Sequence, residues 1–208
     1  MLTTAELRWF YPGKLPQAVI HWFNNEQLGK HLAPTEERED TYLYVPESDF
    51  VGIKLRQGRL EIKWRKAELD NLEFGKVTGK AEKWAKWLCE DASNESFQPQ
   101  VVIGKKAWVS IQKVRTQRKY QVSLEQTVVA IPINDSSDRI CSVELTQLKI
   151  HNDLWWSLAF EASGNELTDT LKIVAEWVLQ FYCEPTLSLP DSYAYPIWLA
   201  KTSISQQM

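Results

Sequence analysis

The sequence predicts an α+β protein whose centre is an antiparallel β-barrel of eight strands, closed or nearly closed, with helices packed on its outside. Most of the chain divides into short runs rich in β-branched and aromatic residues, and turn residues separate these runs. Three other segments carry apolar residues at helical spacing. So many short strands in succession favour closure, because a closed barrel leaves no strand edge exposed.

Residues 51–66, VGIKLRQGRLEIKWRK, predict the clearest pair of strands. Two β-rich runs, 51–56 and 59–65, flank Gln57 and Gly58, and this glycine can adopt the positive φ of a tight turn. Side chains alternate across a strand, so each run has one apolar face and one charged face. The charged face carries Lys54, Arg56, Glu61, Lys63 and Arg65.

Two interpretations fit this hairpin. In the first, the apolar face covers a core and the charges are solvated, as charged strand residues commonly are. In the second, the charged face lines the lumen of a barrel, and helices cover the apolar outside. Like charges on neighbouring strands repel one another, and an anionic ligand would remove that repulsion. The second interpretation therefore predicts a binding site for an anion.

The remaining elements follow along the chain. Further strands are predicted at 5–11, 41–45, 72–77, 101–103 with 108–115, 118–124, 128–132, 140–150 and 155–162. Helices are predicted at 15–29, 78–90 and 167–181, and the last is the clearest because its apolar residues form one stripe. Residues 183–208 are predicted to be an extended tail that its aromatic residues attach to the body. Because the chain has no internal repeat and no linker, residues 1–208 are predicted to form a single domain.

Charge is distributed unevenly along the 208 residues. The net charge is −3, which gives no overall field that would attract nucleic acid. Six of the 24 lysines and arginines nevertheless lie within 51–66, and another six lie within 105–119. This concentration of positive charge indicates a local site.

The cysteines and the absence of targeting signals suggest a location. Cys89, Cys141 and Cys183 lack the spacing of zinc ligands, so free thiols in a reducing cytoplasm are the simplest account. No N-terminal stretch resembles a signal peptide, and no run approaches the roughly 20 apolar residues of a membrane span. We therefore expect a cytoplasmic protein without a membrane partner. The helix at 167–181 could serve a homodimer as readily as a core.

Charged positions also recur on one face of several other predicted strands. Outside the hairpin they are Glu6, Arg8, Lys113, Arg115, Arg118, Glu144 and Glu161. Together with the hairpin they describe a polar lumen that is rich in cations and contains a few carboxylates.

The order of these residues resembles that of the CYTH domain, which belongs to the triphosphate tunnel metalloenzyme superfamily. The resemblance covers roughly residues 4–182. It rests, in chain order, on Glu6, Asp40-Thr41-Tyr42, Lys54-Leu55-Arg56, Glu61-Ile62-Lys63-Trp64-Arg65, Lys113-Val114-Arg115 with Arg118, Glu144 and Glu161. Each motif is short, and their order and spacing carry the resemblance.

The resemblance implies an eight-stranded tunnel that binds a small phosphate compound, with hydrolysis of a triphosphate as the activity. In that family, inward lysines and arginines bind the triphosphate, and inward glutamates bind Mg²⁺ or Mn²⁺. The chemistry agrees, since Arg forks match phosphate oxygens and hard divalent ions prefer carboxylate oxygens. The implied substrate-binding residues are Lys54, Arg56, Lys63, Arg65, Lys113, Arg115 and Arg118, and Arg8 is predicted to join them. The implied metal ligands are Glu6, Glu61, Glu144 and Glu161.

Two departures from the family pattern concern the metal. The family's first strand carries Glu-x-Glu-x-Lys, and here those positions are Glu6, Arg8 and Phe10. In addition, Glu144 is followed by Thr146 and not by a second acid. We therefore expect a tunnel that binds an anionic, phosphate-bearing ligand, with metal-dependent hydrolysis weakened, and the sequence identifies no catalytic residue.

Two other functions fit the same residues. One is a non-enzymatic binding or regulatory protein of this fold that has lost the metal site. The other is a binder of single-stranded nucleic acid, with bases stacked on tryptophans beside a basic groove. The acidic net charge makes nucleic acid the less favoured partner.

Overall fold

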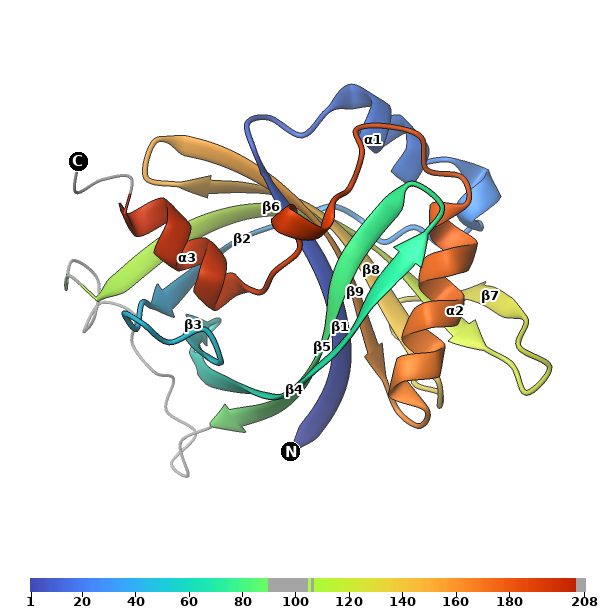
Figure 1. Cartoon of the computed structure of the whole chain (residues 1–208), viewed down its shortest axis with the longest axis horizontal. Helices are drawn as coiled ribbons and strands as arrows, with labels where there is room; N and C mark the ends of the chain where they lie inside the picture. The colour runs from blue at the N-terminus through green and yellow to red at the C-terminus, as the bar shows by residue number, and fades with distance from the viewer. Residues whose placement is uncertain (90–104, 106, 205–208) are drawn as a thin grey trace.

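The computed structural model describes residues 1–89, 105 and 107–204, and its centre is a closed antiparallel barrel (Figure 1). In this part of the chain, nine strands form one sheet in the order β2-β3-β4-β5-β1-β9-β8-β6-β7. Pairing of β2 with β6 closes the first eight of these into the barrel, while β7 pairs with β6 beyond the end of β2. The strands are β1 Leu2–Pro12, β2 Glu36–Leu43, β3 Val51–Arg56, β4 Arg59–Phe74, β5 Val77–Cys89, β6 Trp108–Val122, β7 Val128–Ile131, β8 Ile140–Ile150 and β9 Asp153–Ser163.

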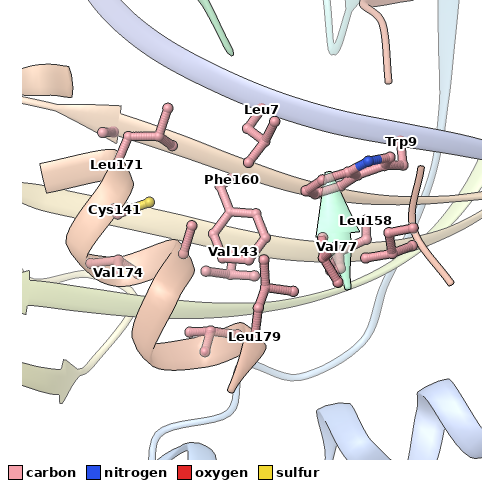
Figure 2. Close-up of a cluster of buried hydrophobic side chains, with 14 of the residues drawn as sticks. Leu7, Trp9, Val77, Cys141, Val143, Leu158, Phe160, Leu171, Val174 and Leu179 are labelled. Atoms are coloured by element: carbon pink, nitrogen blue, oxygen red, sulfur yellow. The ribbon is translucent and has the colours of Figure 1, made fainter. Parts of the chain in front are cut away.

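The main hydrophobic core lies outside the barrel wall. Helix α2, Leu167–Leu179, packs on the outer faces of β1, β8 and β9 (Figure 1). Figure 2 shows Leu7, Val143 and Phe160 from these three strands beside the apolar side chains of α2. Helix α1, Gln17–Phe23, and the short helix η1, Glu26–Leu28, add Val19, Phe23 and Leu28 to the same core.

A second, smaller apolar cluster fills one end of the barrel interior. Phe10 of β1 lies there with inward residues of β2, β6 and β8. The chain after α2 passes through η3, Leu189–Asp191, and returns as helix α3, Tyr195–Ile204, which completes this cluster. The buried members are Phe10, Tyr42, Val109, Ile111, Leu148, Ile150, Tyr193, Trp198 and Leu199.

The predicted fold class is confirmed, as are the 51–66 hairpin and the last long helix. The predicted helix at 78–90 is wrong, because this segment is strand β5 and pairs with β4 on one side and β1 on the other. Its apparent helical stripe places Ala81 and Ala85 on the outer face but Trp84 on the inner face. Two long-range pairings outweigh the local helical spacing here.

Other boundaries also differ from prediction. The acidic run before residue 41 is part of β2, because a charged interior accepts its polar side chains. The predicted helix at 15–29 is shorter, and β4 and β6 each join two predicted segments. The tail after residue 183 is helical in part, although Tyr193 and Trp198 do attach it to the body. The predicted strand at 101–103 lies outside the described residues.

Within the described residues, no helix has both the length and the apolar character that crossing a membrane requires.

Candidate functional site

The charged part of the barrel interior forms a cavity that opens to solvent. The cationic side chains that line it are Arg8, Arg38, Lys54, Arg56, Lys63, Lys80, Lys86, Lys113 and Arg115. The lining carboxylates are Glu6, Glu61, Glu82, Glu144 and Glu161. Eight strands therefore bring together charges that are far apart in the sequence.

Most of the residues predicted for the site do line this cavity. Alternation along each strand explains this: Glu6 and Arg8 of β1 point inward together, and Glu6 lies opposite both Glu82 of β5 and Glu161 of β9. The predicted residues found in the lining are Arg8, Lys54, Arg56, Lys63, Lys113, Arg115, Glu6, Glu61, Glu144 and Glu161. The two exceptions are Arg65 and Arg118.

Arg118 lies on the outside of the barrel. It is three residues after Arg115 in one continuous strand, and this odd spacing places the two on opposite faces. Its guanidinium is buried and donates to backbone carbonyls of the α1–η1 segment, including Phe23 at 2.8 Å and Gly29 at 2.6 Å. Arg118 therefore holds this segment against the barrel wall.

Arg65 lies beside the cavity and forms ion pairs with acidic side chains. Its guanidinium contacts Glu82 at 2.9 Å and Asp49 at 2.7 Å. The chain beyond Arg65 has a bulge in its pairing with β5. Arg65 consequently fixes Glu82 at the wall and is not part of the lining.

Asp40 is the centre of a cluster of four cations, although it is not among the residues predicted for the site. This fully buried carboxylate lies 2.9 Å from Lys113 Nζ and 3.3 Å from Nε of both Arg38 and Arg56. Lys54 Nζ is slightly further away, at 3.8 Å. Although burial alone would raise its pKa, these four cations hold the pKa of Asp40 well below its usual value. Asp40 is therefore a permanent negative charge that holds four cations together.

The four predicted metal ligands each contact a lysine or arginine. Lys63 Nζ bridges Glu6 at 2.6 Å and Glu161 at 3.3 Å. Glu144 contacts Arg8 at 2.8 Å and Arg115 at 3.1 Å. Glu61 lies between Lys54, Arg56 and Lys86, at 3.1 to 3.4 Å.

This arrangement does not suit a divalent metal. Within the described residues, no three or more His, Cys, Asp or Glu side chains form a group that could hold one. A bound metal needs several free carboxylate oxygens, whereas ammonium and guanidinium groups contact the oxygens here. Arg8 is one of these groups.

Positive charge exceeds negative charge within the cavity. Lys54, Arg56 and Lys86 share the single carboxylate of Glu61, with Asp40 as the only further described acid near the first two. The buried Nε of Arg56 lies 3.3 Å from Asp40 but makes no well-aligned hydrogen bond to a described residue. Burial, with repulsion from Arg56 and Lys113, lowers the pKa of Lys54 well below its usual value. The site is therefore a place where an added anion would relieve repulsion.

The inner end of the cavity is formed by two tyrosines and a lysine. Lys113 Nζ donates to the hydroxyls of Tyr42 at 2.7 Å and Tyr195 at 2.9 Å. The two rings are stacked, with centroids 4.9 Å apart. Burial lowers the pKa of Lys113 to about 7, against the opposing effect of Asp40.

Comparisons with known proteins do not assign a function. No family model and no curated protein matches the chain. A conserved hypothetical protein from Pyrococcus furiosus aligns over 93% of this chain and 98% of its own, with 14% identity and a TM-score of 0.48. The PH1012 protein from Pyrococcus horikoshii OT3 aligns over 90% of this chain and 93% of its own, with 16% identity and a TM-score of 0.45.

Proposed function

We propose that the barrel binds a small phosphate-bearing anion in its cavity, and that it does so without a divalent metal. The observation that carries this proposal is the excess of inward cations. Nine lysines and arginines line the cavity, against five lining glutamates and the buried Asp40. Two further carboxylates at its edge, Glu36 and Glu68, pair with Arg38, Arg115 and Lys80 and reduce the excess without reversing it. An anion with several charges would balance this excess.

Phosphate groups fit the donors better than other common anions. Arg8, Arg56 and Arg115 carry planar guanidinium groups, whose shape matches phosphate oxygens, and lysines supply compact positive charge. A bound phosphate would share these groups with the carboxylates that they already contact. The cavity is partly enclosed, so these charges act in a medium that screens them less than bulk water does. A di- or triphosphate group has the charge and the length to contact several of them together.

Metal-dependent hydrolysis is left out of the proposal for a chemical reason. Any glutamate that bound Mg²⁺ or Mn²⁺ would first have to release its lysine or arginine, which would leave a buried cation unpaired. The built-in cations take over the charge neutralisation that a metal would supply.

Single-stranded nucleic acid fits the tryptophans poorly. Trp64 is 48% exposed and packs on Phe50, whereas Trp156 is buried against Tyr11 and Trp155 packs on Trp198. These rings do not form one stacking surface beside the cations. We therefore favour a small ligand.

A thermal-shift titration tests the proposal directly. Tripolyphosphate should raise the unfolding midpoint, because a ligand that binds only the native state stabilises it, by about 2.7 kcal/mol at a hundred times its Kd. The rise should be the same with Mg²⁺ and with chelator. A rise that needs Mg²⁺ would overturn metal independence, and no rise in either buffer would overturn phosphate binding.

Two variants and one control locate the site. Lys54→Met and Arg56→Met should each reduce the shift produced by tripolyphosphate. Lys149→Met is the matched control, because this lysine is exposed on the outer face of β8. Equal losses in all three variants would mean that tripolyphosphate binds the general surface and not the cavity.

A further inference from the structure

The cavity is closed at one end by the chain's own C-terminal segment. Trp198 is fully buried inside that end of the barrel, with its ring stacked 5.0 Å from Phe10 and edge-on to Trp155 at 6.0 Å. Leu199 is 3% exposed beside it. Figure 1 shows α3 lying at the β2–β3 side of the barrel, where this closure occurs.

The opposite end is open within the part of the chain that the structure describes. Leu2 and Leu88 belong to the inward-facing series of β1 and β5, beyond Thr4 and Lys86. Leu2 is 47% exposed and Leu88 is 52% exposed. Within the described residues, the interior is therefore a blind pocket, closed at the α3 end and reached past Leu2 and Leu88.

The closed end presents two hydrogen-bond donors to whatever reaches it. Lys113 directs its ammonium at Tyr42, Tyr195 and Asp40, so both phenolic oxygens already accept a bond from it. Each hydroxyl keeps its own proton for a further bond, and neither donates to another described residue. Burial raises the pKa of Tyr195 to about 12 and also raises that of Tyr42, so both remain protonated at neutral pH.

Arg8 adds positive charge to this closed end, which is the floor of the pocket. Its guanidinium lies 5.0 Å from the centre of the Tyr195 ring while it contacts Glu144. Two O–H donors beside a lysine and an arginine match the terminal phosphate of a chain, which carries more charge than an internal one.

This inference rests on the proposed function. We infer that the ligand enters the pocket end-on, and that Tyr42 and Tyr195 at the floor donate hydrogen bonds to its free terminal phosphate. The ligand class is then linear phosphate compounds with an unesterified end, such as short polyphosphates or organic di- and triphosphates. Longer chains bind by one end and do not pass through.

The stoichiometry on a long linear polyphosphate tests this inference. An end-on pocket allows no more than one protein at each end of the polyphosphate. Light scattering measures the mass of the saturated complex. At every polyphosphate length, this mass should exceed that of the free polyphosphate by no more than one protein per end. A number of bound proteins that grows with chain length would overturn the inference while leaving phosphate binding intact. Failure of tripolyphosphate to bind at all would instead overturn the proposed function, and the inference with it.

Ligand and protein variants give a second test. A nucleoside triphosphate should bind about tenfold or more tightly than a dinucleoside triphosphate, whose two ends are both esterified. Tyr195→Phe should weaken tripolyphosphate binding several-fold, whereas Tyr11→Phe, which changes a tyrosine outside the barrel that contacts the same C-terminal segment, should not. Equal affinity for the two nucleotides, or equal effects of the two substitutions, would overturn the role of the floor.

Discussion

The two faces of the barrel wall have exchanged the roles that the inside and outside of a protein usually hold. The outer face, under α2, carries the larger hydrophobic core, whereas the inner face carries most of the buried charge. Neighbouring residues on one strand belong to different faces: Leu7 packs against the outer core, and Glu6 and Arg8 on either side of it face the cavity. Alternation along the strands thus assigns neighbouring residues to the hydrophobic core and to the charged cavity in turn.

This separation teaches that charged residues can stay inside when the apolar surface is buried elsewhere. Burying leucine or phenylalanine side chains on the outside contributes about 1.5 to 3 kcal/mol each, which offsets the unfavourable desolvation within. The inner face is then free to keep an excess of one charge. Four predictions test this division, in order of decreasing effect.

The largest effect should come from the outer core. Phe160→Ala removes a fully buried ring from β9 and should lower the free energy of unfolding by about 3–5 kcal/mol. Because Phe160 faces away from the cavity, the folded protein should bind tripolyphosphate with unchanged affinity. Urea denaturation and calorimetry measure the two quantities. A loss of affinity equal to the loss in a cavity variant would show that the two faces are coupled.

The next effect should come from the centre of the inner face. Asp40→Asn leaves four buried cations without their shared carboxylate and should lower the free energy of unfolding by about 3 kcal/mol. Tripolyphosphate should then stabilise this variant more than the original protein, because the anion supplies the missing charge. Asp70→Asn, at a residue whose side chain is 86% exposed, is the control. Equal stability of both variants in urea would contradict the role of Asp40.

Arg118→Met should lower stability without changing binding, because Arg118 lies on the outer face of β6. The substitution leaves carbonyls of the α1–η1 segment without their donor and should lower the free energy of unfolding by about 2 kcal/mol. Binding of tripolyphosphate should not change. Arg115→Met, three residues earlier, should instead weaken binding. An effect of Arg118→Met on affinity in the folded protein would return this residue to the binding site.

The smallest effect should be a pH dependence set by Lys113. Burial places its pKa at about 7 in the free protein, and a bound phosphate would raise it. Below that pH the amine is charged with or without ligand. Above it, binding takes up a proton, so affinity should fall by up to about tenfold per pH unit.

Titration calorimetry on the original protein and on Lys113→Arg measures this dependence. Arginine stays charged throughout, so its affinity should follow only the titration of the phosphate itself. The same pH profile in both proteins would mean that Lys113 does not titrate near neutral pH.

The sequence predicts the barrel well because its strands alternate clearly. Period-two patterns at 51–66 identified Lys54, Arg56, Glu61 and Lys63 as one face, and the cavity contains all four. The two N-terminal residues Glu6 and Arg8 were found in the same way. Where the alternation is regular, the face of each charge can be read directly.

The residues that were missed have specific physical reasons. Lys80, Glu82 and Lys86 were hidden because apolar residues of β5 also fit helical spacing, and only its two pairing partners decide the matter. Asp40 and Arg38 lie in a charged run that is typical of a loop unless the interior is itself charged. Arg118 was assigned to the wrong face because a strand break was placed between it and Arg115, whereas β6 is continuous. Tyr195 contacts Lys113 from more than 80 residues further along the chain, and no local pattern predicts so distant a contact.

The closing helix also has a consequence for how the pocket comes into being during synthesis. Tyr195 and Trp198 complete a floor whose other parts, such as Phe10, belong to the first strand. A ribosome that has made every strand of the barrel has therefore not yet made the bottom of the pocket. Until Leu199 has emerged, the apolar cluster at that end lacks the residues of α3. If the ligand binds end-on as proposed, the nascent chain should acquire selectivity for phosphate termini only as α3 docks.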